Sequence, residues 1–217
     1  MNFTVSNKRI SGTVPAVGYA PMIHRYLVAQ ALSGTSETPF VPHESRDIYA
    51  TIDCLKELGF YEGQGAENRH VSYMDCGSSE HTFRMLLPVA AALGRRCEFH
   101  INEILMEEPF SDFLKALKVH GIRHDLISKR SMRMWGQLTA GTFIISSAVS
   151  SQFISGMLFA LPLLHENSTL MIDGSLNNIS GILMTLAVLK EAGITVESRI
   201  NDVSENQKED NIKPELN

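Results

Sequence analysis

Polar residues able to bind an anion gather at three places where the sequence predicts the start of a helix. They are the pair His24-Arg25 and the runs at 77–84 and 149–152. A helix N-terminus offers unpaired N–H donors and a positive dipole end, which suit phosphate, and serine hydroxyls and arginines add hydrogen bonds. For any one of these starts, capping by serine is the better explanation. Recurrence at three starts keeps a shared anion site open beside simple capping.

Other candidate chemistry is weaker. Cys54, Cys76 and Cys97 form no CxxC pair, so we expect three buried thiols and no disulfide. His120 and His124 are four residues apart, but Gly121 between them indicates a helix end and not a metal-binding helix. The single tryptophan provides no platform for nucleic acid bases. The sequence therefore predicts no metal site and no cofactor.

Composition narrows the class of protein. The 217 residues include 19 basic and 24 acidic side chains, a net charge of −5, and 44% are hydrophobic. Such a composition is typical of a globular chain, and without a basic excess nucleic acid is not an expected partner. No apolar run reaches the roughly 18 residues of a membrane span. The N-terminal residues lack a signal pattern, so we expect a cytoplasmic protein with no membrane contact.

One pattern recurs three times along the chain. The segments LKELG, LKVHG and LKEAG end at Gly59, Gly121 and Gly193, and each glycine can adopt the left-handed conformation that ends a helix. Each closes a stretch with apolar residues at helical spacing. We expect Ser45 to cap the first of these helices, Ser111 to cap the second, and the third to cover about 180–192. The apolar stripes of the first two are Ile48, Ile52, Leu55 and Leu58, then Phe110, Leu114 and Leu117.

Another helix is predicted before each of these, and short β-type segments are predicted between them. The helices cover about 21–32, 79–93 and 150–164, and the strands 3–5, 10–14, 96–101, 141–146, 169–172 and 195–199. The repeating unit of strands and helices recurs every 60–70 residues or so. We therefore expect a single α/β domain over 1–200, with pseudo-threefold symmetry. The charged residues 201–217 predict a disordered tail.

Several of these segments resemble a known family. Residues 149–158, VSSQFISGML, with ALPL at 160–163, closely resemble the VSSQ signature of the EPSP synthase (3-phosphoshikimate 1-carboxyvinyltransferase) family. Residues 24–32, 47–59, 77–84 and 109–121 are similar to further family motifs in the same order. The resemblance covers about residues 1–200, roughly the N-terminal half of such an enzyme. It implies an α/β fold of three pseudo-symmetric βαβαββ-type units in a single enolpyruvyl-transferase-like domain.

The resemblance also implies roles for particular residues. Ser150 and Ser151 would contact the phosphate of shikimate 3-phosphate, Gln152 would bond its ring and Arg25 would pair with its carboxylate. Ser78 and Arg84 would be remnants of the side that binds phosphoenolpyruvate. No catalytic residue of the family is carried over to this chain.

Departures from the family pattern affect that second ligand. Ala20 and Pro21 stand where the family has lysine and serine. Glu80 replaces a glycine, Glu108 replaces an arginine and Ser78 replaces an asparagine. Residues 178–181 depart from the family's SKPY segment. Each like-charge pair at ~4 Å and an effective dielectric of ~20 costs about 4 kcal/mol. We therefore expect poor binding of phosphoenolpyruvate.

Three functional hypotheses follow. The first is a transferase component of the shikimate pathway that is incomplete or inactive alone and needs a complementary second-domain chain or a homo-oligomer. The second is a non-enzymatic anion-binding module derived from this fold. The third, a relative acting on UDP-N-acetylglucosamine, is disfavoured by the VSSQ motif.

Overall fold

A computed structural model describes residues 4, 13, 18–35, 37–41, 45–61, 71–102, 108–175 and 179–199. The helices in this part are α1 (Ala20–Leu32), α2 (Arg46–Glu57), α3 (Glu80–Ala92), α4 (Glu108–Val119), α5 (Ser151–Ala160), the 3-10 turn η1 (Leu161–Leu163) and α6 (Ser180–Glu191). The strands are β1 (Ser72–Gly77), β2 (Cys97–Ile101), β3 (Ile122–Ser128), β4 (Ser131–Gly136), β5 (Thr142–Ser146) and β6 (Thr169–Asp173). None of the helices in these ranges is long and apolar enough to cross a membrane.

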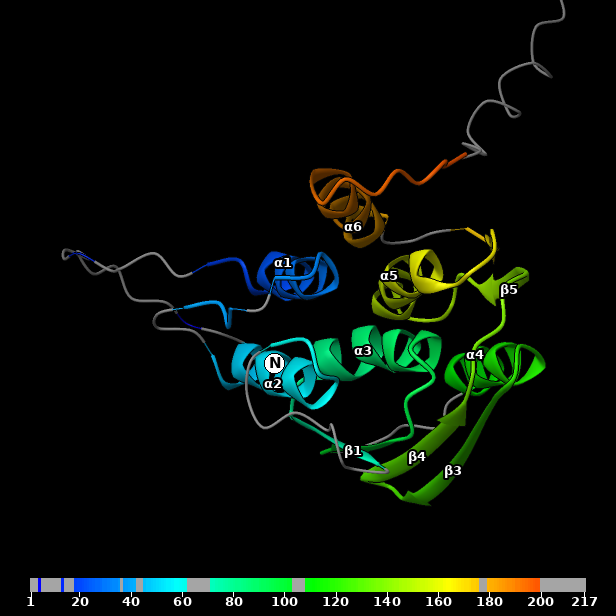
Figure 1. Ribbon diagram of the computed structural model, residues 1–217, viewed down its shortest axis with the longest axis horizontal. Helices are drawn as coiled ribbons and strands as arrows, with labels where there is room; N and C mark the ends of the chain where they lie inside the picture. The colour runs from blue at the N-terminus through cyan, green and yellow to red at the C-terminus, as the bar shows by residue number, and fades with distance from the viewer. Residues whose placement is uncertain are drawn as a thin grey trace, which may run out of the picture.

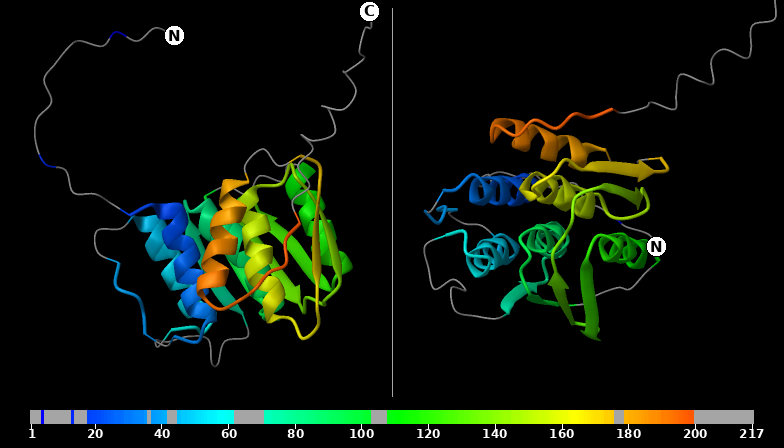
Figure 2. Two further views of the ribbon diagram at one scale, coloured as in Figure 1. Left: turned by 90° about the horizontal axis from the view of Figure 1, so that it is seen from above. Right: turned by 45° about the vertical axis from the view of Figure 1, so that its right-hand side comes forward.

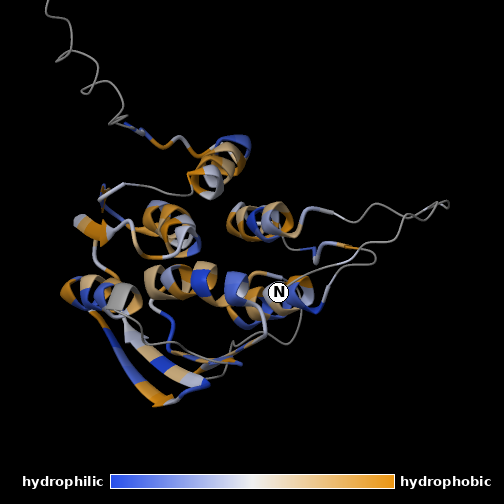
Figure 3. Ribbon diagram, turned by 180° about the vertical axis from the view of Figure 1, so that it is seen from behind, coloured by the Kyte–Doolittle hydropathy of each residue, from blue (hydrophilic) through white to orange (hydrophobic). Residues whose placement is uncertain are grey.

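The six helices lie side by side in layers above one sheet. Figure 1 looks nearly along their axes and shows α2, α3 and α4 over the sheet, with α1 and α5 in the next layer and α6 outermost. The two views of Figure 2 show the same stacking from above and obliquely. Coloured by hydropathy, the helices carry both apolar and polar positions (Figure 3), as expected where one side of a helix packs on its neighbours.

The sheet below the helices has the strand order β1-β2-β4-β3. β1 and β2 are parallel, whereas β4 is antiparallel to both β2 and β3. Side chains alternate along β1 and β2, and the inward set, including Met74, Cys76, Cys97 and Phe99, is fully buried. This sheet closes the lower side of the core. The second sheet contains β5 and β6 in parallel.

Helices α3 and α5 are in close contact at Gly156. A methyl group at this glycine would lie 2.7 Å from the Met85 carbonyl oxygen and 2.8 Å from that of Arg84. Pro88 lies inside α3 and has no N–H to bond the Arg84 carbonyl four residues earlier. A glycine on α5 thus fits against the part of α3 where the helix bonding is interrupted. Because both helices are buried here, this contact sets their separation.

Much of the predicted organisation is confirmed. Helices occupy all six predicted regions, and strands lie at three of the predicted β segments. Gly59, Gly121 and Gly193 adopt φ values of 89°, 95° and 80° directly after their helices. The three cysteines are free and buried. Residues 72–136 contain one complete βαβαββ unit, with β1, α3, β2, α4, β3 and β4 in order. The described chain is a single α/β domain.

Several expectations were wrong in detail. Ser111 does not cap α4, because the helix begins at Glu108 with a proline in its first turn. Ser45 is the N-cap residue of α2, as expected, although its side chain makes no capping hydrogen bond. Residues 195–199 form no strand: all of them except Val196 are exposed, so the segment has neither a buried face nor a hydrogen-bonded neighbouring strand within the described part of the chain. The predicted helix to Leu164 ends at Ala160 and continues as η1, which contains Pro162.

The remaining differences concern β structure. Strands β1, β3 and β4 were not predicted. The expected strands at 3–5 and 10–14 lie outside the described residues, apart from Thr4 and Thr13, and so does the predicted tail at 201–217.

Candidate functional site

Arg25 lies in a buried polar layer beneath the starts of α5 and α6. The residue is only 2% exposed. Nε donates to the Thr185 hydroxyl at 2.8 Å and to the Gly181 carbonyl at 3.2 Å, and Nη2 donates to the Ser155 hydroxyl at 3.1 Å. Nη1 donates to the Pro21 carbonyl in the same helix. Burial lowers the pKa of this guanidinium from its usual range. Arg25 therefore ties α1 to both α5 and α6.

Gly181 brings Arg25 next to Ser151. A methyl group at this glycine would lie 3.1 Å from the Ser151 hydroxyl and 3.2 Å from Nη2 of Arg25. The ends of both side chains thus lie close to the same point at the start of α6. Because Ser151 is half-buried, the buried arginine lies next to the accessible part of the site here.

A second buried series of polar groups joins α1, α2 and α3. Nδ1 of His24 lies 2.7 Å from the Thr51 hydroxyl, which lies 2.6 Å from that of Thr82. Thr82 in turn donates to the hydroxyl of Ser79, the N-cap of α3, at 2.8 Å. All four residues are buried. These bonds fix the start of α3 relative to α1 and α2.

On the solvent-exposed side of these buried polar groups, the Arg84 side chain links the starts of α3 and α5. Its Nη1 donates to the Ser150 hydroxyl at 3.4 Å and to Oε1 of Gln152 at 3.2 Å. Its Nη2 lies 2.7 Å from a carboxylate oxygen of Glu80, one turn earlier in α3. The guanidinium carbon is also 6.0 Å from the centre of the Phe153 ring. Arg84 is 27% exposed, so its charge is reachable from solvent.

His81 completes the accessible layer. Its ring stacks on that of His24, with centroids 5.1 Å apart and planes 8° apart. The amide nitrogen of Gln152 lies 3.0 Å from its Nε2. Burial lowers the pKa of His24 to about 3, with His81 and Arg25 as further causes. Burial also lowers the pKa of His81, with the charges of Arg25 and Arg84 adding to it.

Ser78 and Asp47 form the edge of this layer. The exposed hydroxyl of Ser78 donates to a carboxylate oxygen of Asp47 at 3.1 Å. Asp47 lies in the first turn of α2. The accessible layer is therefore composed of Asp47, Ser78, Glu80, His81, Arg84, Ser150, Ser151 and Gln152.

The structure brings the residues singled out in the sequence into one region. Ser150, Ser151, Gln152 and Arg84 lie in the accessible layer, with Ser78 at its edge and Arg25 directly below. Sequence reasoning missed the histidine stack and the threonine series. The signal that could have found them is a polar residue within an apolar stripe, such as Thr51 among Ile48, Ile52 and Leu55.

The arrangement is suited to holding an anion. Hydroxyl, amide and guanidinium groups converge, and a partly buried arginine binds oxyanions strongly. Among the described residues, no group of three or more histidine, cysteine, aspartate or glutamate side chains is placed to hold a metal ion. A separate hollow of about 400 Å³ is lined by Asp53, Cys54, Lys56, Glu57, Tyr73 and Asp75. It lies at β1 and the later turns of α2, away from the residues of the accessible layer.

Comparison with known proteins identifies the family. The sequence model of the EPSP synthase (3-phosphoshikimate 1-carboxyvinyltransferase) family matches residues 5–213. The chain belongs to this family. A protein of Brachyspira hyodysenteriae named 3-phosphoshikimate 1-carboxyvinyltransferase is 30% identical over 215 residues, which cover 94% of this chain and 51% of the relative. One of the same name from Clostridium kluyveri is 30% identical over 206 residues, which cover 89% and 48%.

Solved structures give the same fold. An EPSP synthase from Acinetobacter baumannii superimposes with a TM-score of 0.61 at 17% identity, covering 89% of this chain and 46% of that structure. The chain thus spans about half the length of the relatives it matches. The resemblance stated from the VSSQ motif is confirmed at the level of family and fold.

Proposed function

We propose that this chain is the acceptor-binding half of an EPSP-synthase-type transferase. It binds shikimate 3-phosphate or a similar phosphorylated, carboxylated polyol. Enolpyruvyl transfer needs a second half, supplied by another chain or by a second copy. The purified chain alone has no transferase activity.

One observation carries this proposal. Ser150, Ser151, Gln152 and Arg84 meet at the starts of α3 and α5, above the Arg25 guanidinium. Hydroxyl groups and Arg84 suit a phosphate, and the Gln152 amide suits a ring hydroxyl. Nη2 of Arg25, which would lie 3.2 Å from a methyl group at Gly181, is the arginine nitrogen that suits the carboxylate.

The other ligand of the family, phosphoenolpyruvate, is poorly accommodated by the same layer. The exposed carboxylate of Glu80 lies on Arg84, and Asp47 adds a second acidic group at the edge. Ala20 provides no cation at the start of α1. Phosphoenolpyruvate bound beside Glu80 and Asp47 would meet like charges, and no cation at the start of α1 offsets the repulsion.

Calorimetric titration tests the proposal. We expect shikimate 3-phosphate to bind and phosphoenolpyruvate not to bind. Ser151→Ala and Arg84→Gln should each weaken binding about tenfold. Arg130→Gln, at an exposed arginine next to Asn102, is the matched control and should leave the affinity unchanged. Unchanged affinity in both site variants, or no binding at millimolar ligand, would exclude this site.

A second experiment separates the transferase component from a non-enzymatic binding module. The chain is mixed with the separately purified C-terminal half of the Brachyspira hyodysenteriae relative and both substrates. Turnover in the mixture but in neither half alone supports the transferase component. Binding of shikimate 3-phosphate without turnover in any mixture supports the module, and turnover by the chain alone contradicts the expected inactivity.

A further inference from the structure

Two histidines from different helices stack where the candidate site opens to solvent. The rings of His24 in α1 and His81 in α3 are nearly parallel, 5.1 Å apart between centroids. His24 is buried below, whereas His81 is half-exposed above. The stack thus presents one imidazole, that of His81, to a ligand in the accessible layer. Neither ring has a role in the function proposed above.

The groups that face His81 come from four helices. His24 and Arg25 lie on α1, Asp47 on α2, Glu80 and Arg84 on α3 itself, and the neutral Gln152 on α5. Burial and the two guanidinium groups lower the pKa of His81, while Asp47 and Glu80 partly oppose them. Near neutral pH, the ring is therefore uncharged in the free protein.

An anion in the site would lie close to this ring. Arg84 and His81 both contact the side-chain amide of Gln152, Arg84 through Oε1 and His81 through the amide nitrogen. An oxyanion bound by Arg84 and the Ser150 hydroxyl is therefore separated from His81 by no more than the length of one side chain. Opposite charge at this distance favours the imidazolium, in which both ring nitrogens donate. Because the site is partly buried, solvent screens this attraction only in part.

We infer that His81 is a further anion-binding residue of this site, and that it holds the ligand as an imidazolium, so that one proton is taken up from solvent with each anion bound. The inference rests on the proposed function, because it places the anion between Arg84 and Ser150. The ligands concerned are doubly charged oxyanions, of which a phosphate monoester is one. A singly charged ligand would cause the uptake of a smaller fraction of a proton per ligand bound.

Proton uptake gives the affinity a defined dependence on pH. The bound anion raises the pKa of His81 above its value in the free protein. Affinity is therefore highest at low pH and falls as pH rises through the pKa of the complex. We expect it to be roughly tenfold higher at about pH 6 than at about pH 8.

Sulfate is the suitable probe, because any proton uptake measured with it comes from the protein. It remains a dianion over this range, whereas phosphate changes its charge. Calorimetric titration at one pH in bis-tris and in Tris, whose ionisation enthalpies differ, counts the protons taken up. We expect between about half a proton and one proton per sulfate. In His81→Gln, sulfate should still bind, with neither proton uptake nor the pH dependence.

His124→Gln is the matched control, because His124 lies on β3 and its pKa is also lowered by burial. It should behave as the parent chain. Sulfate binding by the parent chain without proton uptake would overturn the inference and leave the proposed function intact, whatever the behaviour of the variants. Proton uptake that persists in His81→Gln would overturn the assignment to His81. Binding of neither sulfate nor shikimate 3-phosphate at any pH would overturn the proposed function as well.

Discussion

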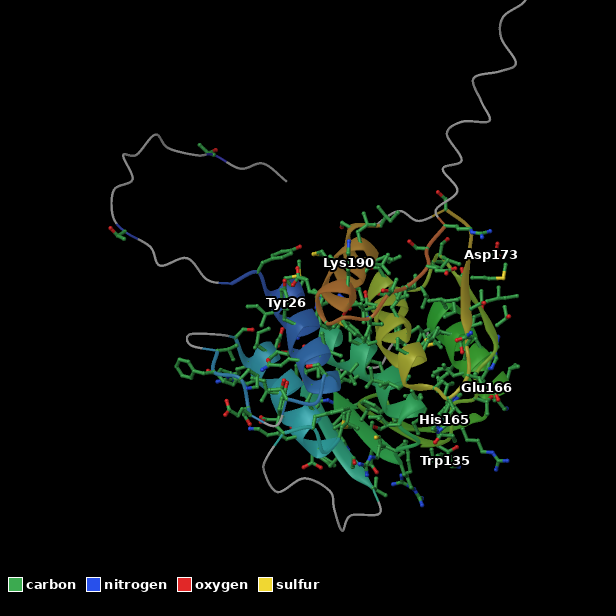
Figure 4. The ribbon with its side chains drawn as sticks, turned by 45° about the horizontal axis from the view of Figure 1, so that its top comes forward. Tyr26, Trp135, His165, Glu166, Asp173 and Lys190 are labelled. Atoms are coloured by element: carbon green, nitrogen blue, oxygen red, sulfur yellow. The ribbon has the colours of Figure 1, made fainter. Side chains whose placement is uncertain are left out.

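The Arg25 guanidinium donates a 2.8 Å hydrogen bond to the Thr185 hydroxyl, 160 residues further along the chain. Thr185 in turn donates to the Ser155 hydroxyl at 2.8 Å. One buried arginine thus holds together α1, α5 and α6 next to the site. On the exposed side of the same helices, the Tyr26 hydroxyl donates to Glu191, and Figure 4 shows Tyr26 beside α6.

Replacing Arg25 should unfold the protein more readily. Arg25→Met keeps the apolar stem but removes the charged donor to the Thr185 and Ser155 hydroxyls and to the Gly181 carbonyl. We expect the free energy of unfolding to fall by about 3 kcal/mol, as when one partner of a buried charged network is removed. Urea denaturation followed by circular dichroism measures it. Arg130→Met, at an exposed arginine, should change the stability by less than about 0.5 kcal/mol. An equal effect of both variants would contradict a stabilising role for the buried Arg25 hydrogen bonds.

Two helical glycines should respond differently to an added methyl group. Gly156→Ala places the methyl against backbone carbonyls of α3, which cannot turn away, and should cost about 1–3 kcal/mol. Gly181→Ala meets only the ends of two side chains, and alanine favours the helix by about 1 kcal/mol. It should therefore leave the thermal midpoint nearly unchanged but weaken shikimate 3-phosphate binding. The opposite order of stabilities would contradict the close contact of α3 and α5.

Acid should destabilise the fold through His24. Its pKa in the folded protein, about 3, lies below the ordinary value of 6.5. The unfolded chain therefore binds the proton first, so the stabilisation is complete above about pH 6.5 and is lost as pH falls toward the folded pKa. Between about pH 6.5 and pH 5 this amounts to about 1–2 kcal/mol.

Urea denaturation at several pH values checks that slope. His24→Gln should flatten it, because a neutral amide replaces the titrating ring. His165→Gln, at an exposed histidine just beyond η1 (Figure 4), should keep the slope of the parent chain. Identical slopes in all three proteins would show that His24 is not the group responsible.

Removing the Glu80 carboxylate should strengthen anion binding. Glu80→Gln frees Arg84 from its 2.7 Å ion pair and removes a negative charge from the accessible layer. We expect sulfate affinity to rise about fivefold, for a stability cost below about 1 kcal/mol from the lost helix-start charge and surface pair. Titration calorimetry measures the change. Asp53→Asn, in an ion pair with Lys56 three residues away on α2, should leave affinity unaltered.

The helices could be predicted because each has a regular stripe of apolar residues. Ile48, Ile52 and Leu55 in α2 are all buried, as their spacing required. Strand β3 was missed because only Ile122 on it is buried, so the sequence has no alternation to detect. Residues 195–199 show the reverse case, in which a segment predicted as a strand forms none.

The site was predicted in part for a similar reason. Ser150, Ser151 and Arg84 were found because they lie at helix starts, a local feature of the sequence. The depth of Arg25 depends on Ser155 and Thr185, which are far away in the chain. The stack of His24 on His81 likewise arises only when α1 and α3 pack together. Such long-range pairings leave no local pattern.

The contact at Gly156 separates the frame of the site from its chemistry. Because α5 rests directly on the carbonyl groups of α3, the distance between the two helix starts is set by main chain and survives changes of side chain. The side chains at 80, 81, 84 and 150–152 are therefore free to change over evolution, while the backbone positions that carry them stay in place. This chain can acquire new ligand preferences by surface substitution alone, without rebuilding its interior.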